Sequence, residues 1–151
     1  MAGLYFEQFE VEQKFQHEIR RTVSEADNVW FCGATYNPAQ IHIDAEYCAN
    51  TEFGKPLINS IFTLGLVLGL SIQDTTLGTT VANLGMTDTK FPKPVFAGDT
   101  IRSITTVVEL RESKSRPDNG IVTFRHEGYN QRNELVCTTL RQALMLRRPQ
   151  A

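Results

Sequence analysis

The chain has 151 residues, the length of one domain, which is enough to bury a hydrophobic core without disulfides or metal ions. Hydrophobic residues make up 41% of the sequence and charged residues 21%, values typical of a soluble globular protein, so disordered, collagen-like and membrane-spanning classes are excluded. The formal net charge is -2, which provides no electrostatic basis for binding nucleic acid.

Cysteine usage and the N-terminus both indicate a reducing compartment. The three cysteines lie far apart and lack the spacing of a metal site. Glu7 and Glu10 stand where a secretory signal peptide would carry basic residues. The longest apolar stretch, residues 57–72, is shorter than the roughly 20 residues that a membrane span needs. We therefore expect a cytoplasmic protein with no membrane segment.

The first part of the chain predicts a strand and then a helix. Residues 1–14 are polar with scattered aromatic side chains and predict an arm or a first strand, and residues 15–23 predict an edge strand. Ser24 and Asp27 have the pattern of a helix N-cap with an acid at N3. That helix is expected to end at Asn37, because the residue before a proline avoids the α region. Its apolar face would consist of Val29, Cys32, Gly33 and Tyr36.

The rest of the chain predicts one buried helix followed by strands. Asp44 is a candidate cap for a short helix over 45–49, and residues 57–72 are apolar almost all round, as in a helix wrapped by other structure. Period-two patterns separated by turn sequences then predict strands over 79–91, 100–111, 120–129 and 134–146. This order indicates an α+β hotdog fold, a long antiparallel sheet wrapped around one central helix. We expect a single domain over 1–151, with its core at about 15–146.

Three motifs occur in a fixed order: Asn-Pro-Ala-Gln-Ile-His-Ile-Asp at 37–44, Phe-Gly-Lys-Pro-Leu-Ile-Asn-Ser at 53–60, and Phe-Pro-Lys-Pro-Val-Phe-Ala-Gly-Asp-Thr at 91–100. Together they resemble the MaoC-like dehydratase family, the (R)-specific enoyl-CoA hydratases. Asp-Thr-Thr-Leu-Gly-Thr at 74–79 and Glu-Ser-Lys-Ser-Arg-Pro at 112–117 are similar to hydratases of branched C5-dicarboxylyl thioesters such as itaconyl-CoA and mesaconyl-CoA. The resemblance implies addition of water to such an ester, giving citramalyl-CoA or methylmalyl-CoA.

The resemblance assigns the catalytic histidine to His42. Hydration of an enoyl thioester needs a base for water, a proton donor for the α-carbon, and donors that stabilise charge on the thioester oxygen. The family supplies the first two with an aspartate and a histidine five residues later. Here that place holds Asn37, or Thr35 when the Asn-Pro pair is aligned instead. An amide orients water but does not accept its proton, so His42 is expected to be the main base.

Further residues are expected to support the reaction. Ser60 matches the family's backbone oxyanion donor at the start of the buried helix, where free N–H groups and the helix dipole favour an anion; its alternative role is the helix cap. Asp44 is either a substitute acid or base, or a helix cap. Tyr36 either donates a hydrogen bond to the substrate or packs in the core.

The free carboxylate of a dicarboxylyl substrate normally requires an arginine. Arg116 belongs to the Lys-Ser-Arg-Pro motif, and Arg111 and Arg125 are alternatives. Lys114 is a candidate for binding the CoA phosphates. A solvated charge cluster on a hairpin is the alternative explanation for the residues of this motif.

Other hotdog activities remain open, because a fold does not determine a function. Hotdog thioesterases commonly place an acid on the buried helix, and residues 57–72 contain none, which favours the hydratase. A non-catalytic acyl-CoA binder is the second alternative, because the family aspartate is missing. No metal or redox cofactor is expected, since the reaction moves protons on a thioester that already carries CoA. The expected partners are an acyl-CoA substrate and a second copy of the chain, since one hotdog exposes a sheet edge.

Overall fold

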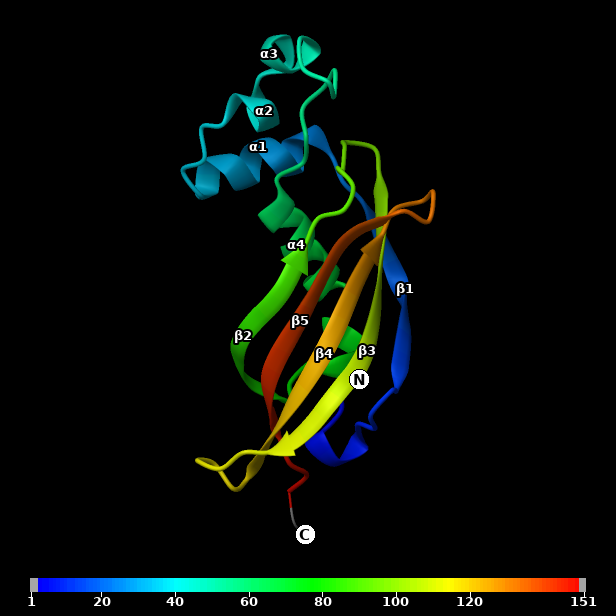
Figure 1. Ribbon diagram of the computed structural model, residues 1–151. Helices are drawn as coiled ribbons and strands as arrows, with labels where there is room; N and C mark the ends of the chain where they lie inside the picture. Colours follow the sequence, from blue (N-terminus) through cyan, green and yellow to red (C-terminus); the bar gives the residue numbers. More distant parts are fainter. Residues whose placement is uncertain (1–2, 150–151) are drawn as a thin grey trace.

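The computed structural model describes residues 3–149, in which one antiparallel sheet wraps around a helix (Figure 1). The strands are β1 (Lys14–Thr22), β2 (Thr80–Lys90), β3 (Thr100–Glu112), β4 (Asn119–Tyr129) and β5 (Leu135–Leu146). Their order across the sheet is β1-β3-β4-β5-β2, and all neighbours are antiparallel. The predicted hotdog fold is confirmed, and each strand begins and ends within one residue of its predicted bounds.

The helical segments are η1 (Phe6–Gln8), α1 (Glu25–Ala34), α2 (Gln40–Ile43), α3 (Ala45–Ala49), α4 (Ser60–Gly69) and α5 (Ile72–Thr75). The central helix is α4, whereas α1, α2 and α3 form a helical cap beyond one end of the sheet (Figure 1). Within residues 3–149, no helix is both long and apolar enough to cross a membrane.

Two predicted N-caps are present. Ser24 Oγ accepts a hydrogen bond from Asp27 N–H at 3.2 Å, and Asp27 Oδ2 accepts one from Ser24 N–H at 2.8 Å, which forms a capping box. Asp44 Oδ1 accepts a hydrogen bond from Tyr47 N–H at 2.9 Å. Local sequence signals therefore determine where α1 and α3 begin.

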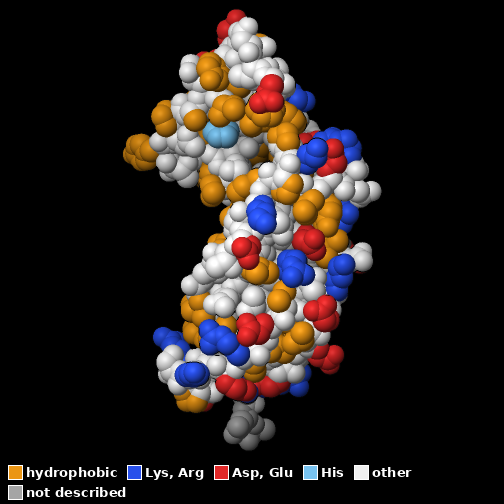
Figure 2. All heavy atoms as spheres, in the orientation of Figure 1, with side chains coloured by type: hydrophobic (Ala, Val, Ile, Leu, Met, Phe, Trp, Pro, Cys, Tyr) orange, Lys and Arg blue, Asp and Glu red, His pale blue; other side chains and the backbone are white. Residues whose placement is uncertain are grey.

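The predicted end and inner face of α1 are wrong. The helix ends at Ala34 rather than Asn37, and Tyr36 follows with a left-handed φ of 54° and a 93% exposed side chain. Of the four residues predicted to form its buried apolar face, only Cys32 is buried, and Val29 is 57% exposed. Core packing of Tyr36 is therefore excluded, because the chain leaves the helix before that residue. Hydrophobic side chains instead gather on the surface of the helical cap (Figure 2).

The central helix is shorter and less enclosed than predicted. Leu57 forms an isolated bridge with Phe96, so the helix begins only at Ser60. Val67 packs against β4 at Gly128, where a Cβ would lie 2.3 Å from Val67 Cγ2. On the other face Ile61 is 57% exposed, so all-round burial of this helix is wrong for a single chain.

The core contains two clusters of apolar side chains. The first lies between α4 and the sheet and includes Val23, Ile58, Val67, Ile101 and Val136. The second lies around η1, where the N-terminal arm places Phe6 and Phe9 against Val107, Val122, Phe124 and Met145. The first cluster holds the start of α4 in place against the sheet.

Candidate active site

His42 lies on α2, and a backbone carbonyl fixes its ring. Its Nδ1 is 2.9 Å from the carbonyl oxygen of Leu57. Because a carbonyl oxygen only accepts hydrogen bonds, Nδ1 carries the proton, and Nε2 of the neutral ring presents a lone pair. His42 is therefore set up to accept a proton at Nε2.

A buried amide on α1, Asn28, holds this arrangement together. Its side chain is 2% exposed, and Nδ2 donates hydrogen bonds to the carbonyl oxygens of His42 at 2.7 Å and Leu57 at 2.8 Å. Its Oδ1 accepts a hydrogen bond from Asn59 N–H at 2.8 Å. Asn28 thus connects α1, the backbone of His42 and the residue before α4. The sequence analysis did not identify Asn28 as part of the site. The one indication in the sequence is that this polar residue lies one helical turn before Cys32, on the same face of α1.

The start of α4 offers a free backbone donor. Asn59 Oδ1 accepts a hydrogen bond from Ile61 N–H at 2.9 Å, so Asn59 is the N-cap and the capping role considered for Ser60 is wrong. The Ser60 N–H has no hydrogen-bond partner within residues 3–149. It lies at the positive end of the helix dipole, where it can stabilise a developing oxyanion.

His42 and the start of α4 line a common cavity of about 310 Å³. Its polar walls are Thr35, Asn37, His42, Asn59 and Ser60. Four residues singled out in the sequence are thereby brought together: Thr35, Asn37, His42 and Ser60. Asn37 Oδ1 accepts a hydrogen bond from Ala39 N–H at 3.0 Å and shapes the loop, and its Nδ2 has no partner in the described part of the chain.

His42 also lines two further cavities. One of about 290 Å³ adds Thr63 and Lys93 to His42 and Ser60 in otherwise apolar walls. The other, of about 180 Å³, is lined by Glu25, Asn28 and Lys55 among others. Glu25 is the one carboxylate that lines any of the three cavities among residues 3–149. Within the same residues, no carboxylate forms a hydrogen bond with His42.

The other residues predicted for the site do not join this group. Both oxygens of Asp44 are occupied, Oδ1 by Tyr47 N–H and Oδ2 by Gln40 Nε2 at 3.2 Å, so its capping role is confirmed. Tyr36 lies in a separate groove outside α1. Lys114 and Arg116 belong to the hairpin between β3 and β4, at the end of the sheet opposite the helical cap (Figure 1). Within one chain, the structure does not bring them near His42.

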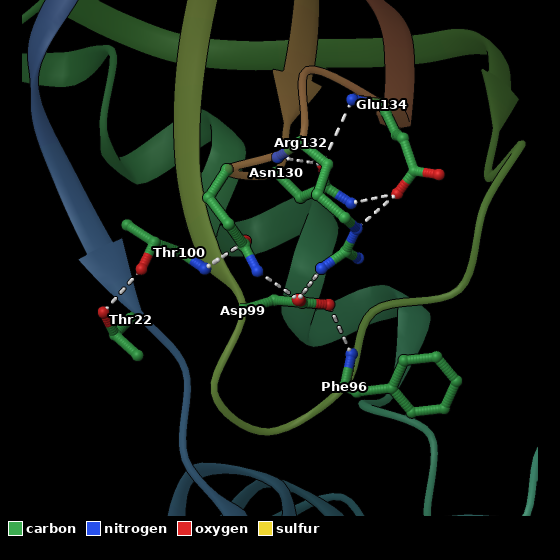
Figure 3. A network of polar contacts seen from close by, with 8 residues as sticks. Thr22, Phe96, Asp99, Thr100, Asn130, Arg132 and Glu134 are labelled. Carbon is green, nitrogen blue, oxygen red and sulfur yellow. Dashed lines mark hydrogen bonds and ion pairs between the residues drawn. The ribbon is translucent and has the colours of Figure 1, made fainter.

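The loop between β2 and β3, which lines the cavity containing Lys93, is anchored by Asp99. Its Oδ2 accepts a hydrogen bond from Phe96 N–H at 3.0 Å, and its Oδ1 accepts hydrogen bonds from Gln131 Nε2 at 2.8 Å and Arg132 Nη1 at 3.1 Å (Figure 3). Burial raises the pKa of Asp99, but these donors outweigh burial and bring it below the ordinary value. The loop is therefore tied to the turn between β4 and β5.

Comparison with known proteins places this architecture in a family. The sequence matches the family model described as MaoC like domain over residues 6–130. The mesaconyl-CoA hydratase of Cereibacter sphaeroides is 32% identical over 152 aligned positions, which cover 99% of this chain and 43% of that protein. The beta-methylmalyl-CoA dehydratase of Chloroflexus aurantiacus is 26% identical, with 97% and 41% covered. The chain thus spans about two fifths of the length of these curated relatives.

A solved structure gives the same result. The MaoC-like dehydratase from Rhodospirillum rubrum is 29% identical and superimposes with a TM-score of 0.85, over 98% of this chain and 100% of that chain. Fold, motif order and family model agree over most of the sequence. The chain therefore belongs to the MaoC-like domain family.

Proposed function

We propose that this chain is a hydratase that adds water across the double bond of an enoyl-CoA thioester, with a branched C5-dicarboxylyl ester such as mesaconyl-CoA or itaconyl-CoA as its substrate. The main support is the cavity that His42 shares with the free N–H of Ser60. The names of the two curated relatives, a mesaconyl-CoA hydratase and a beta-methylmalyl-CoA dehydratase, support the same substrate class.

In the proposed reaction, His42 acts first as base and then as acid. Nε2 takes a proton from a water molecule that Asn37 Nδ2 holds by donating a hydrogen bond to its oxygen. The water oxygen adds to the β-carbon, and the electron pair of the double bond moves through the α-carbon to the thioester oxygen. The Ser60 N–H stabilises that charge. The protonated Nε2 then gives its proton to the α-carbon, so one water has been added and neutral His42 is restored.

This scheme replaces the family aspartate with one histidine in two roles. The carbonyl oxygen of Leu57 holds Nδ1–H in both states, since imidazole and imidazolium each donate through that nitrogen. Adding water to the double bond causes no net oxidation or reduction, so the proposed reaction needs no redox group.

We further propose that the working unit is a homodimer formed through β2, each chain contributing one hotdog domain. All eleven residues of β2 are exposed, and it is an edge strand with unpaired backbone groups. Its apolar side chains include Val81 and Leu84, which are 40% and 48% exposed. The uncovered face of α4 also carries Ile61 at 57% exposure. The curated relatives are more than twice as long as this chain, which leaves room in them for a second hotdog domain.

A thioesterase and a non-catalytic acyl-CoA binder are the competing functions. The central helix carries no acidic residue between Ser60 and Gly69, which argues against a thioesterase. Purified chain mixed with mesaconyl-CoA is expected to lose the enoyl absorbance without releasing free thiol, and mass spectrometry should show a product heavier by one water. Release of thiol would instead identify a thioesterase. Binding of the ester with no change in absorbance would identify a binder.

A further inference from the structure

The cavity of about 290 Å³ beside His42 is lined by one positively charged residue, Lys93, which is exposed to solvent. Its polar walls are His42, Ser60, Thr63 and Lys93, and apolar side chains such as Val95 and Val136 form the rest. Lys93 is the one lysine or arginine that lines this cavity among residues 3–149, and no acidic residue of that range lines it. A negatively charged group entering this space would therefore meet Lys93.

Lys93 has no ion pair or hydrogen bond with any other residue of 3–149. The charge of Lys93 does act on one acidic residue, Glu134. The pKa of Glu134 is lowered mainly by hydrogen bonds from Asn130 and Arg132 and more weakly by the charge of Lys93. Glu134 Oε2 accepts hydrogen bonds from Asn130 Nδ2 at 2.7 Å and Arg132 Nε at 2.9 Å, and the ion pair of Glu134 within residues 3–149 is with Arg132 and not with Lys93. The ammonium group of Lys93 is thus available for an external anion.

We propose that Lys93 binds the second carboxylate of a dicarboxylyl thioester and so determines the preference for acidic over neutral acyl groups. This inference rests on the proposed hydratase function. In a branched C5 ester, the free carboxylate lies only a few bonds from the thioester carbonyl. When that carbonyl sits at the Ser60 N–H, a cation that pairs with the carboxylate is expected to line a cavity that also contains Ser60, as Lys93 does.

The other candidate cations do not meet this condition. Arg116 and Lys114 lie at the opposite end of the sheet within one chain (Figure 1). Lys55 lines a different cavity, the one of about 180 Å³ that also contains Glu25. Its Nζ lies over the Phe96 ring, 4.5 Å from the ring centroid. Of the two cavities that contain both Ser60 and His42, the one of about 290 Å³ is lined by Lys93, and the one of about 310 Å³ is lined by no lysine or arginine among residues 3–149.

The test compares two substrates that differ only in the carboxylate. Wild-type chain, Lys93→Ala and Lys93→Gln are assayed on mesaconyl-CoA and on tiglyl-CoA, in which a methyl group replaces that carboxylate. Both variants are expected to lose roughly tenfold to a hundredfold in kcat/KM on mesaconyl-CoA, as for loss of a hydrogen bond to a charged group. On tiglyl-CoA the loss should stay below about threefold. Competitive inhibition by the saturated analogues of both esters gives the same comparison where turnover of tiglyl-CoA is slow.

A charge-matched variant and a truncated substrate separate the alternatives. Lys14→Ala removes the same charge from the start of β1, at an exposed residue that does not line the cavity, and should leave the kcat/KM for both substrates unchanged. The mesaconyl ester of pantetheine, which lacks the nucleotide phosphates of CoA, should show the same loss with Lys93→Ala as the CoA ester. Equal losses on both CoA esters that vanish with pantetheine would mean that Lys93 binds CoA phosphates, and the inference would be wrong. A wild-type chain that hydrates neither ester would instead overturn the proposed function itself.

Discussion

The geometry of His42 depends on residues distant in sequence. Leu57 supplies the carbonyl oxygen that fixes the ring tautomer, and Asn28 holds both that carbonyl and the backbone of His42. Because Asn28 also accepts a hydrogen bond from Asn59 N–H, the proposed base and the helix that carries the proposed oxyanion donor share one anchor. Asn28 is thus a positioning residue that acts through His42 and α4.

Substitution Asn28→Asp tests this positioning role, because it retains the acceptor for Asn59 N–H and replaces the donor with an oxygen facing two carbonyls. We expect the free energy of unfolding to fall by at least about 2 kcal/mol and kcat to fall roughly tenfold to a hundredfold, with a smaller change in KM. Burial raises the pKa of the new carboxyl group, and its protonated form regains one donor. The ratio of variant to wild-type kcat should therefore rise as the pH falls.

The readout for Asn28→Asp is kcat per folded molecule, measured across pH at a temperature where circular dichroism shows both proteins folded. Asn28→Ala is the control, because it has no group to protonate and its kcat ratio should not depend on pH. A variant with lowered stability but wild-type kcat at every pH would show that Asn28 supports only the fold.

At the residue scale, sequence reasoning found three polar residues that line one cavity, but it did not find the residue that holds them in position. His42, Asn37 and Ser60 were found because they stand in short motifs, and they line one cavity. Asn28 was missed because its partners lie 14 to 31 residues away, and nothing local indicates them. Lys114 and Arg116 were proposed from their motif, but the motif carries no information on which end of the sheet it occupies.

At the scale of elements, α4 is held by close contact with the sheet. Gly128 on β4 lets Val67 approach, since a Cβ there would lie 2.3 Å from Val67 Cγ2. Strand bounds were predictable because period-two patterns and turn residues are local. The end of α1 and the open face of α4 were not, because a pattern of apolar residues indicates a buried face without saying which chain buries it.

Gly128→Ala is expected to lower the free energy of unfolding by about 1 to 3 kcal/mol, because the added methyl group forces Val67 or the strand to move. Gly33→Ala in α1 is the matched control: no atom lies within 4 Å of the position that its added methyl group would take, and the helix gains up to about 1 kcal/mol. Urea unfolding measures both changes. Equal free energies of unfolding for Gly128→Ala and wild type would show that Val67 can move away from the added methyl group without loss of stability.

At the scale of the whole molecule, two surfaces remain uncovered in a single chain. The edge strand β2 is exposed along its full length, and the face of α4 with Ile61 is open. Both would be covered if a second hotdog domain paired with β2. The opposite edge of the sheet, β1, supplies a natural control because it is also exposed at Ile19.

Leu84→Lys should dissociate the proposed dimer by placing a charge on β2, whereas Ile19→Lys on β1 should leave it intact. Sedimentation equilibrium across a micromolar concentration range measures the association directly. We expect wild type and Ile19→Lys to be dimers and Leu84→Lys to be a folded monomer. A monomeric wild type, or a dimer that survives Leu84→Lys unchanged, would contradict an interface at β2.

The central claim is that His42 moves the proton, and steady-state hydration of mesaconyl-CoA by His42→Ala tests it most directly. Leu57 O keeps its hydrogen bond from Asn28 in this variant, so the fold should persist, which circular dichroism can confirm. We predict that kcat falls roughly a hundredfold to ten-thousandfold, the range for loss of a general acid–base group. A folded His42→Ala variant with kcat within about threefold of wild type would contradict the account.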